Sequence, residues 1–400
     1  MLTLEEAQQA LIHAVRRTTR QETVPLDRAV GRFTAKELRA RVDNPAFDNS
    51  AMDGYAVATA DLITKNFVLP LAGESSCGDA PQTLRPGTTM RIFTGAPVPH
   101  GADAVVMQED IKQSREQIVF PRTVQPGQYI RRQGEDFRAG ELLYAAGRLL
   151  TPFDIALLSS AGVAEVSVYA QARVLVVATG NELISPGKSL APGQIYESNR
   201  LATLLLLRQL GVEAVDGGTV RDDPAALRAL LAASTDFDFI ITSGGASVGD
   251  HDLVKQAFAE IGKIEFWKVR VKPGKPIAFG HVGSRTHFFA LPGNPVSSLV
   301  TFKLFVEPAL IAWHHGTAQR SELPATAANS FRRHAGRTEF LRGRVHVEGR
   351  RLMATALTGQ GSHMLAALRE TTVLIRVEAD SQGFAAGDSV LVTPLTLAFS

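Results

Sequence analysis

The periodicity of hydrophobic and polar positions changes along the chain. Between about 40 and 140 the pattern is that of short β-strands. Apolar runs such as "TTMRIF" and "GADAVVM" are broken by Pro and Gly every several residues, which is typical of a β-rich module. Helical spacing flanks this stretch at 3–18 and 152–161, and Thr3 and Glu6 have the spacing of a capping box. We expect the two flanking helices to pair, with the β-rich module inserted between them.

Between 171 and 316, strand-like and helix-like patterns alternate. Short β-branched runs such as "RVLVVATG" and "FDFIITSGG" predict buried strands, and "SNRLATLLLLRQLG" predicts a helix. Asp223 is placed as the N-cap of a second helix and Pro224 as its first residue. Further helices are expected in "HDLVKQAFAEIG" and "VSSLVTFKLFVEPALIAW". This alternation predicts a parallel sheet with both faces covered.

From about 322 the chain is strand-like again, with clear alternation in "RGRVHVEG". The fold class is therefore multidomain α/β plus β. The expected domains are a helical stalk (1–40 with 141–170), an inserted β-rich module (41–140), a three-layer α/β domain (171–320) and a C-terminal β-barrel (321–400).

Composition and charge restrict the class of protein further. A net charge of +2 with scattered basic residues gives no nucleic-acid-binding surface. The single cysteine, Cys77, excludes an internal disulfide and any multi-cysteine metal site. The first residues lack the apolar core of a signal peptide, and no apolar run reaches the roughly 18 residues of a membrane span. We therefore expect a cytoplasmic protein with no membrane partner.

Polar residues follow four of the predicted strands. They lie in Thr179–Glu182, Arg221–Asp223, Thr242–Asp252 and Leu291–Pro295. Each loop taken alone is explained by the usual preference of Gly and Asp for turns and helix caps. Four such loops at the carboxyl ends of neighbouring strands would meet at one edge of the sheet, which is where this architecture binds ligands.

The loop "TSGGASVGDHD" has the glycine content of a phosphate-binding loop but lacks the Gly-Lys-Ser/Thr ending of a P-loop. Its glycines would let backbone N–H groups approach an anion, and the following helix would add its N-terminal partial charge. The residues expected to bind phosphate are Ser243, Gly244, Gly245, Ser247 and Gly249.

Carboxylates beside a phosphate require a cation between them, and Mg²⁺ is the usual one. Asp252 is expected in the first turn of the next helix. Helix capping explains an aspartate there less well than at the N-cap, so Asp252 is a candidate metal ligand. Glu182 and Asp222 are two further candidates. Asp250 is either a ligand or only the N-cap of that helix.

Three lysines follow in "FWKVRVKPGKP", namely Lys268, Lys272 and Lys275. In an extended strand Lys268 and Lys272 point to the same face, where they suit an anionic ligand. The alternative is a solvated edge strand that uses lysine against aggregation.

The inserted module also contains candidate polar residues. Asp53 lies in "FDNSAMDGYAV", Thr94 in "TGAPVP", and Arg131 and Asp136 in "IRRQGED". Asn, Asp, Ser and Gly favour turns, so these segments are either ordinary turns or tight loops that hold a functional carboxylate.

Ten ordered motifs between about 44 and 298 resemble the MoeA family of molybdopterin molybdenumtransferases, and the chain is also similar to the C-terminal domain of gephyrin. They are "FDNSAMDGYA", "RIFTGAPVP", "AVVMQE", "IRRQGED", "ATGNEL", "GQIYESNR", "RDD", "TSGGASVGDHD", "FWKVRVKPGKP" and "LPGNPVSS". The resemblance implies an α/β domain of the molybdopterin-binding type. It also implies a homodimer whose active sites lie between the α/β domain of one subunit and the inserted module of the other.

The activity that the resemblance implies is insertion of molybdate into adenylylated molybdopterin, with Mg²⁺ as cofactor and release of AMP. Other proteins of molybdenum-cofactor synthesis are expected as partners. Two alternatives remain, a molybdopterin adenylyltransferase and a non-catalytic, gephyrin-like scaffold. The longer architecture favours the transferase over the first, and the lack of an extra domain or long linker disfavours the second.

The resemblance carries roles over to particular positions. The expected catalytic residues are Asp53, Asp136, Glu182, Asp222, Asp252, Lys268 and Lys272, of which Glu182, Asp222 and Asp252 would hold the metal. The expected substrate-binding residues are Thr94, Arg131, Ser243, Gly244, Gly245, Ser247, Gly249, Lys275, Pro292, Gly293, Asn294 and Pro295. One departure is Asn181, where many members of the family have aspartate.

Overall fold

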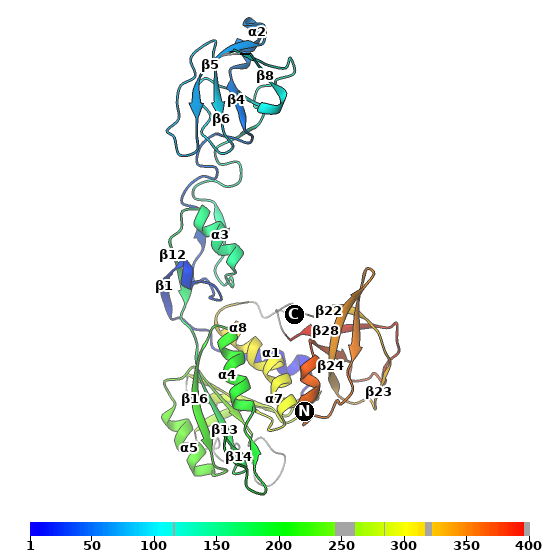
Figure 1. Cartoon of the computed structure of the whole chain (residues 1–400). Coiled ribbons are helices and arrows are strands. Elements are labelled where there is room, and N and C mark those ends of the chain that lie inside the picture. Colours follow the sequence, from blue (N-terminus) through cyan, green and yellow to red (C-terminus); the bar gives the residue numbers. More distant parts are fainter. Residues whose placement is uncertain (115–116, 245–260, 284, 317–321, 396–400) are drawn as a thin grey trace. The chain divides into compact units, whose positions relative to one another are not determined.

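The chain folds into two compact units (Figure 1). The computed structural model describes residues 1–114, 117–244, 261–283, 285–316 and 322–395. Unit 1 comprises Met1–Glu22, Gly31–Phe33 and Val168–Ser400, and unit 2 comprises Thr23–Val30 and Thr34–Ser167. The finer division into four domains stays a prediction.

The centre of unit 1 is a six-stranded sheet. Its order is β16 (Glu213–Val220), β13 (Arg173–Thr179), β17 (Phe239–Ser243), β21 (Thr286–Leu291), β20 (Ala278–Val282) and β18 (Gly262–Trp267). The first four strands are parallel as predicted, but β20 and β18 are antiparallel, so the sheet is mixed. β20 and β21 follow each other closely in sequence, and only antiparallel neighbours can be joined by so short a connection.

Alternate residues of the strands enter two different cores. Val174 and Val176 of β13 face one side, with α1 (Leu4–Ala14), α4 (Asn199–Gln209) and the helices after β21. Leu175 and Val177 face the other side, with α5 (Pro224–Ala233). Because successive side chains of a strand point to opposite faces, helices on both faces give the predicted three-layer architecture.

The N-terminal helix α1 packs on this sheet. Thr3 and Glu6 form the predicted capping box, and Leu4, Ala7 and Leu11 are buried in the same core as the strands. The expected partner helix, α3 (Pro152–Ser160), lies in unit 2. The expected pairing of the two helices stays a prediction, and the apolar stripe of α1 is covered by the sheet and by α8 (Glu307–Trp313).

The helix after β21 is interrupted. It runs through α7 (Pro295–Thr301), a π-helical turn η3 (Phe302–Val306) and α8 (Glu307–Trp313). Pro308 has no N–H to donate to the carbonyl of Leu304, and Nε2 of Gln8 donates to that carbonyl instead at 2.8 Å. By length and composition Pro295–Trp313 is apolar enough to cross a membrane, but 72% of its most apolar window is buried in the core.

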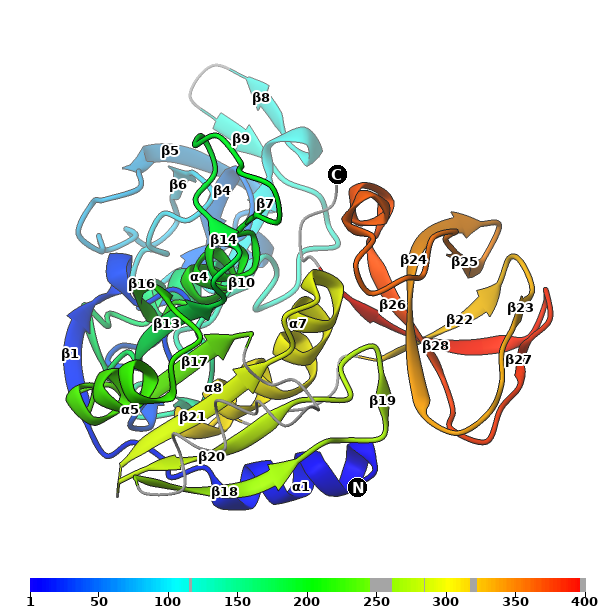
Figure 2. The same ribbon diagram turned by 90° about the horizontal axis from the view of Figure 1, so that it is seen from below.

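The C-terminal part of unit 1 is the predicted barrel (Figure 2). Five strands follow one another in a ring that β24 and β26 close. They are β24 (Thr338–Glu348), β25 (Arg351–Ala356), β22 (Leu323–Ala327), β28 (Ser389–Pro394) and β26 (Val373–Val377). The short strand β19 (Val271–Lys272) from the α/β part pairs with β24 and joins the two sheets within the unit.

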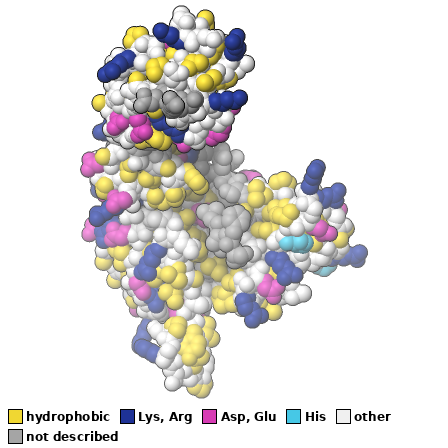
Figure 3. All heavy atoms as spheres, turned by 45° about the horizontal axis from the view of Figure 1, so that its top comes forward, with side chains coloured by type: hydrophobic (Ala, Val, Ile, Leu, Met, Phe, Trp, Pro, Cys, Tyr) yellow, Lys and Arg dark blue, Asp and Glu magenta, His cyan; other side chains and the backbone are white. Residues whose placement is uncertain are grey.

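Unit 2 contains the β-rich module predicted from the Pro- and Gly-broken pattern. Its six-stranded sheet has the order β7 (Ala104–Met107), β4 (Gly54–Val57), β6 (Thr89–Ile92), β5 (Val68–Ser75), β9 (Gln117–Val119) and β8 (Lys112–Ser114). On the face shown in Figure 3, side chains of both charges are interspersed over the surface, as the near-balanced composition leads one to expect.

Candidate active site

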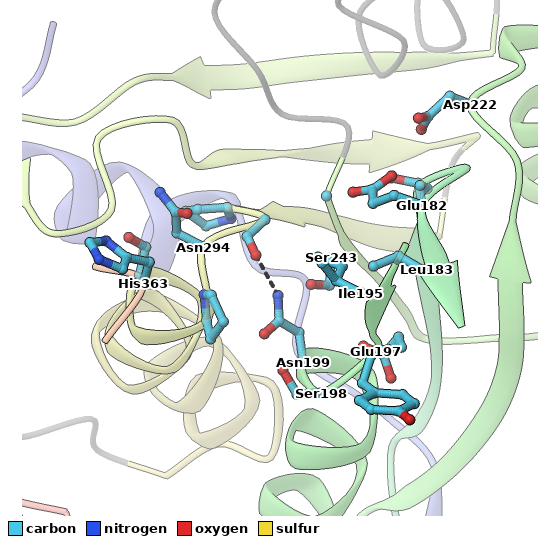
Figure 4. A pocket seen from close by; sticks show the side chains of 18 of the residues that line it. Glu182, Leu183, Ile195, Glu197, Ser198, Asn199, Asp222, Ser243, Asn294 and His363 are labelled. Atoms are coloured by element: carbon cyan, nitrogen blue, oxygen red, sulfur yellow. Dashed lines mark hydrogen bonds between the residues drawn. The ribbon is translucent and has the colours of Figure 1, made fainter. Parts of the chain in front are cut away.

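The loops after the strands of unit 1 surround a cavity of about 900 Å³ (Figure 4). Strand ends and the loops after them contribute Thr179, Gly180, Glu182, Asp222, Ser243, Gly244, Pro292, Gly293, Asn294 and Pro295. The four polar loops of the sequence therefore meet at one edge of the sheet. This convergence confirms the prediction for the described residues of those loops.

Glycines allow the strand ends to come this close together. Gly244 has φ +95°, and a Cβ at that position would lie 2.5 Å from the carbonyl oxygen of Thr179. Its backbone N–H donates to the carbonyl of Leu291 at 3.2 Å. A Cβ on Gly293 would lie 3.7 Å from the Cα of Gly244. A side chain at position 244 would therefore collide with the backbone of Thr179, whereas one at position 293 would make only an ordinary contact with Gly244.

Among the described residues three carboxylates line the cavity, and Glu182 and Asp222 are the two that the sequence singled out. Asp222 exchanges two long hydrogen bonds with Asn181: it accepts from the Asn181 N–H and donates its own N–H to Asn181 Oδ1, both at 3.3 Å. Among the described residues, no hydrogen bond reaches the carboxylate of Glu182. Both groups therefore keep oxygen lone pairs for a ligand.

These two carboxylates fit a magnesium ion by their chemistry. Mg²⁺ prefers oxygen ligands and is usually held by one or two carboxylates together with phosphate oxygens and water. Within the described part of the chain, no three His, Cys, Asp or Glu side chains are grouped to hold a metal ion by themselves. A cation here would depend on oxygens from the substrate, or on Asp252, which lies outside the described residues.

The start of α4 forms a wall that the sequence reasoning missed. Nδ2 of Asn199 donates to the carbonyl of Gly293 at 2.7 Å and so ties α4 to the loop before α7. The carboxylate of Glu197 is 4% exposed and accepts from the Arg200 N–H at 2.6 Å. The motif "GQIYESNR" contains both residues, but it carries no glycine-rich or charged pattern that indicates a cavity wall.

A second missed wall comes from the barrel. His363 lines the cavity, and the neighbouring Ser362 carbonyl accepts from the Val296 N–H in the first turn of α7 at 3.1 Å. The guanidinium of Arg342, 1% exposed, donates to the carbonyls of Gly359 and Gly361 and holds this loop. Burial lowers the pKa of Arg342. Only the fold brings this loop to α7, because the two are far apart in sequence.

The three lysines do not lie on one strand, because Lys268 follows β18, Lys272 is in β19 and Lys275 comes after β19. Lys268 has φ +71° directly after β18, and the Val269 N–H donates to the carbonyl of Lys275 at 3.1 Å. Lys272 Nζ pairs with Glu339 Oε1 at 2.8 Å. The predicted common face of Lys268 and Lys272 is therefore wrong, because β18 ends at Trp267 and the positive φ of Lys268 interrupts the extended backbone before β19. Pro276, next to Lys275, is the residue of this segment that lines the cavity.

The candidates in the inserted module belong to unit 2. Asp53 Oδ1 accepts from the N–H and the hydroxyl of Thr94 at 2.7 and 2.8 Å, and these bonds lower its pKa. Asp136 accepts from Asn44 Nδ2 at 2.9 Å. Arg131, in β10 (Ile130–Arg131), pairs with β3 (Asn49–Ser50). The module holds these carboxylates in hydrogen-bonded loops, and their part in the site stays a prediction.

Several expected residues lie outside the part of the chain that the structure describes. They are Gly245, Ser247, Gly249, Asp250 and Asp252, together with most of the helix expected in "HDLVKQAFAEIG".

Comparisons with known proteins cover nearly the whole chain. The MoeA N-terminal region (domain I and II) matches residues 2–162, a probable molybdopterin binding domain matches 175–312, and the MoeA C-terminal region (domain IV) matches 324–395. A molybdopterin molybdenumtransferase of Haemophilus influenzae is 39% identical, with 98% of each chain covered. Molybdopterin molybdenumtransferase 2 of Mycobacterium tuberculosis is 37% identical, covering 97% of this chain and 98% of that protein. The crystal structure of the MoeA protein of Pyrococcus horikoshii OT3 has a TM-score of 0.84 at 29% identity and covers 98% and 100% of the two chains.

Proposed function

The chain belongs to the molybdopterin molybdenumtransferase family, and from that premise we propose that it inserts molybdate into adenylylated molybdopterin and releases AMP. The observation that carries the proposal is the cavity in which Glu182 and Asp222 face the backbone of Ser243 and Gly244. A cavity lined by two carboxylates suits a phosphate–Mg²⁺ pair, because the cation can bind the carboxylates and the phosphate oxygens together.

Glu182 and Asp222 would hold Mg²⁺ on the phosphoanhydride of the substrate. The ion supplies positive charge where negative charge grows as the anhydride breaks. Ser243 and Gly244 would form the wall against which the phosphate lies, and Asn199 would keep α4 at the correct distance from Gly293. Fixed groups of this kind cost no reorganisation during the reaction.

The positive charge for molybdate would come from the lysine segment. Lys275 precedes the cavity residue Pro276, and Lys272 is half exposed although it pairs with Glu339. Lys268 lies in the same segment. Lysine suits a small oxyanion as a point charge on a flexible stem.

A homodimer in the cytoplasm would complete the site. In this arrangement Asp53, Thr94, Arg131 and Asp136 of one copy would close the cavity of the other. The exposed position of Asp53 supports such a role, because a carboxylate on the surface is accessible to a second chain.

The test mixes the purified protein with adenylylated molybdopterin and Mg²⁺, with and without molybdate. AMP released only when molybdate is present supports the proposal. Formation of the adenylate from ATP would instead support an adenylyltransferase, and no chemistry at all would support a scaffold. The Glu182→Gln/Asp222→Asn double variant is the matched control, since it keeps the size of both side chains and removes both charges.

A further inference from the structure

Two apolar side chains face the cavity beside its carboxylates. Leu183 lies in β14 (Leu183–Ile184) and Ile195 in β15 (Ile195–Tyr196), and the two residues are partners in this parallel pair. Register partners point to the same face of a sheet, and both side chains line the cavity. Ile195 is 54% exposed, so a large aliphatic surface is open to whatever occupies the cavity.

The backbone under these side chains is held in place. The Ile195 N–H donates to the carbonyl of Glu182, and the Glu197 N–H donates to that of Ile184, both at 2.9 Å. The hydroxyl of Tyr196 donates to the carbonyl of Lys188 at 3.0 Å. An apolar surface held rigid before binding loses little conformational entropy when a ligand covers it.

This surface lies at one particular end of the cavity. Figure 4 shows Leu183 and Ile195 on the side of Glu182, with Asn294 and His363 at the other end. Leu183 directly follows the candidate metal ligand Glu182 in sequence. A flat ring packed on the two side chains would therefore lie beside a group bound at the carboxylate of Glu182.

We propose that Leu183 and Ile195 form the platform on which the adenine ring of the adenylylated substrate packs. This inference rests on the proposed function. That substrate carries a ring system on each side of its phosphates. The pterin side must meet molybdate, for which the lysine segment next to Pro276 is proposed. Leu183 and Ile195 belong to a different segment of the cavity lining and are therefore left for the adenine. Apolar walls with a few polar groups are typical of sites for such rings.

The experiment compares two ligands that share a phosphorylated ribose but differ in the base. AMP and ribose 5-phosphate are titrated calorimetrically, with Mg²⁺, into the full-length wild type, Ile195→Ser and Leu183→Ala. Loss of the aliphatic surface should weaken AMP binding by roughly tenfold and leave ribose 5-phosphate unchanged, so the preference for AMP falls. Leu205→Ser is the matched control, because Leu205 is 50% exposed on α4 outside the cavity lining; its preference should equal that of the wild type.

Two failures are distinguishable. If the wild type binds neither ligand in the presence of Mg²⁺, the proposed function itself fails. If the wild type prefers AMP and both platform variants keep that preference in full, only the platform is wrong. A variant that keeps its AMP affinity but shows a raised KM for adenylylated molybdopterin would assign the surface to the pterin and overturn the inference.

Discussion

Asp53 in unit 2 and Glu182 in unit 1 are both acidic residues that the family resemblance assigns to the site, yet their surroundings are opposite. Asp53 accepts two hydrogen bonds from Thr94, whereas no hydrogen bond from a described residue reaches the carboxylate of Glu182. A carboxylate that accepts several bonds is stabilised in its charged form and has fewer lone pairs left for a ligand. The main role of the Asp53 carboxylate is therefore to hold a loop, whereas the Glu182 carboxylate remains available to a cation.

The same contrast extends to neighbouring residues of each unit. In unit 2, Asp48 binds the Gln133 N–H at 2.8 Å and the Arg132 guanidinium at 2.6 Å. In unit 1, the only hydrogen bond to the Asp222 carboxylate from a described residue is the 3.3 Å contact from Asn181. These acids of unit 2 shape its loops, whereas Glu182 and Asp222 of the cavity are left for chemistry.

The largest expected effect comes from the available carboxylates. Glu182→Gln or Asp222→Asn should lower the rate of AMP release about a thousandfold, because the cation loses a charged ligand. The melting temperature should stay the same, since neither carboxylate supports the fold. Rates measured over a range of Mg²⁺ concentrations check this. If both variants kept the wild-type rate and the wild-type Mg²⁺ requirement, Glu182 and Asp222 would not differ in function from the hydrogen-bonded acids of unit 2.

A fully satisfied acid should behave in the opposite way. Burial of Asp154 in α3 acts to raise its pKa, but hydrogen bonds from Tyr144, Thr151 and Arg148 outweigh burial and lower the pKa to about 2. Its ordinary value is 3.8, so this group adds about 2 kcal/mol of stability above pH 3.8. That contribution is lost as the pH falls through the folded pKa near 2.

Asp154→Asn should therefore destabilise unit 2 by about 2 kcal/mol at neutral pH and leave turnover unchanged below the unfolding temperature. Thermal unfolding of wild type and variant at pH 7 and near pH 2 measures this. The difference between the two proteins should shrink at the lower pH, and a constant difference would contradict the assigned cause.

Substitution of Asp53 should reduce activity by an amount between those expected for Glu182 and Asp154. Asp53→Asn keeps an oxygen for the Thr94 N–H but weakens a charge-assisted pair, so we expect roughly a tenfold loss of kcat/KM. Thr94→Val is the companion variant, since it removes only the hydroxyl donor. Similar losses in the two variants would show that the pair acts as one unit. A loss in Asp53→Asn as large as that in Glu182→Gln would mean that Asp53 contacts the substrate itself.

The smallest expected effect concerns residue 181, which lies beside the cavity residue Asp222. Asn181→Asp adds a carboxylate beside Asp222, which should lower the half-saturating Mg²⁺ concentration roughly threefold through added negative charge. The assay is AMP release against Mg²⁺ concentration, with Asn181→Ala as a control that adds no charge. An unchanged Mg²⁺ dependence would place residue 181 outside the reach of the cation.

Local patterns in the sequence predicted those elements whose causes are local. Asp223 and Pro224 start α5 as expected, and Asp223 accepts from the Ala225 N–H at 2.9 Å. The convergence of four loops followed from one general rule about strand ends. Lys268 was misjudged because its positive φ depends on contacts with residues 275–277, which alternation along the strand does not include.

Features that depend on distant contacts could not be read from the sequence. The hydrogen bond from Asn199 to Gly293 and the place of His363 in the cavity each join segments far apart in the chain. The antiparallel direction of β20 likewise depends on which neighbour it pairs with, since a short apolar run has no direction of its own.

The cavity wall from the barrel has a consequence for how the protein is made. Chains are synthesised from the N-terminus at about 5–20 residues per second, and domains fold as they emerge. The α/β loops of the cavity therefore leave the ribosome seconds before Ser362 and His363. Until β24 has formed and Arg342 has bound Gly359 and Gly361, the nascent cavity lacks one side. A product terminated before the barrel should thus keep the carboxylates of the cavity and still be inactive.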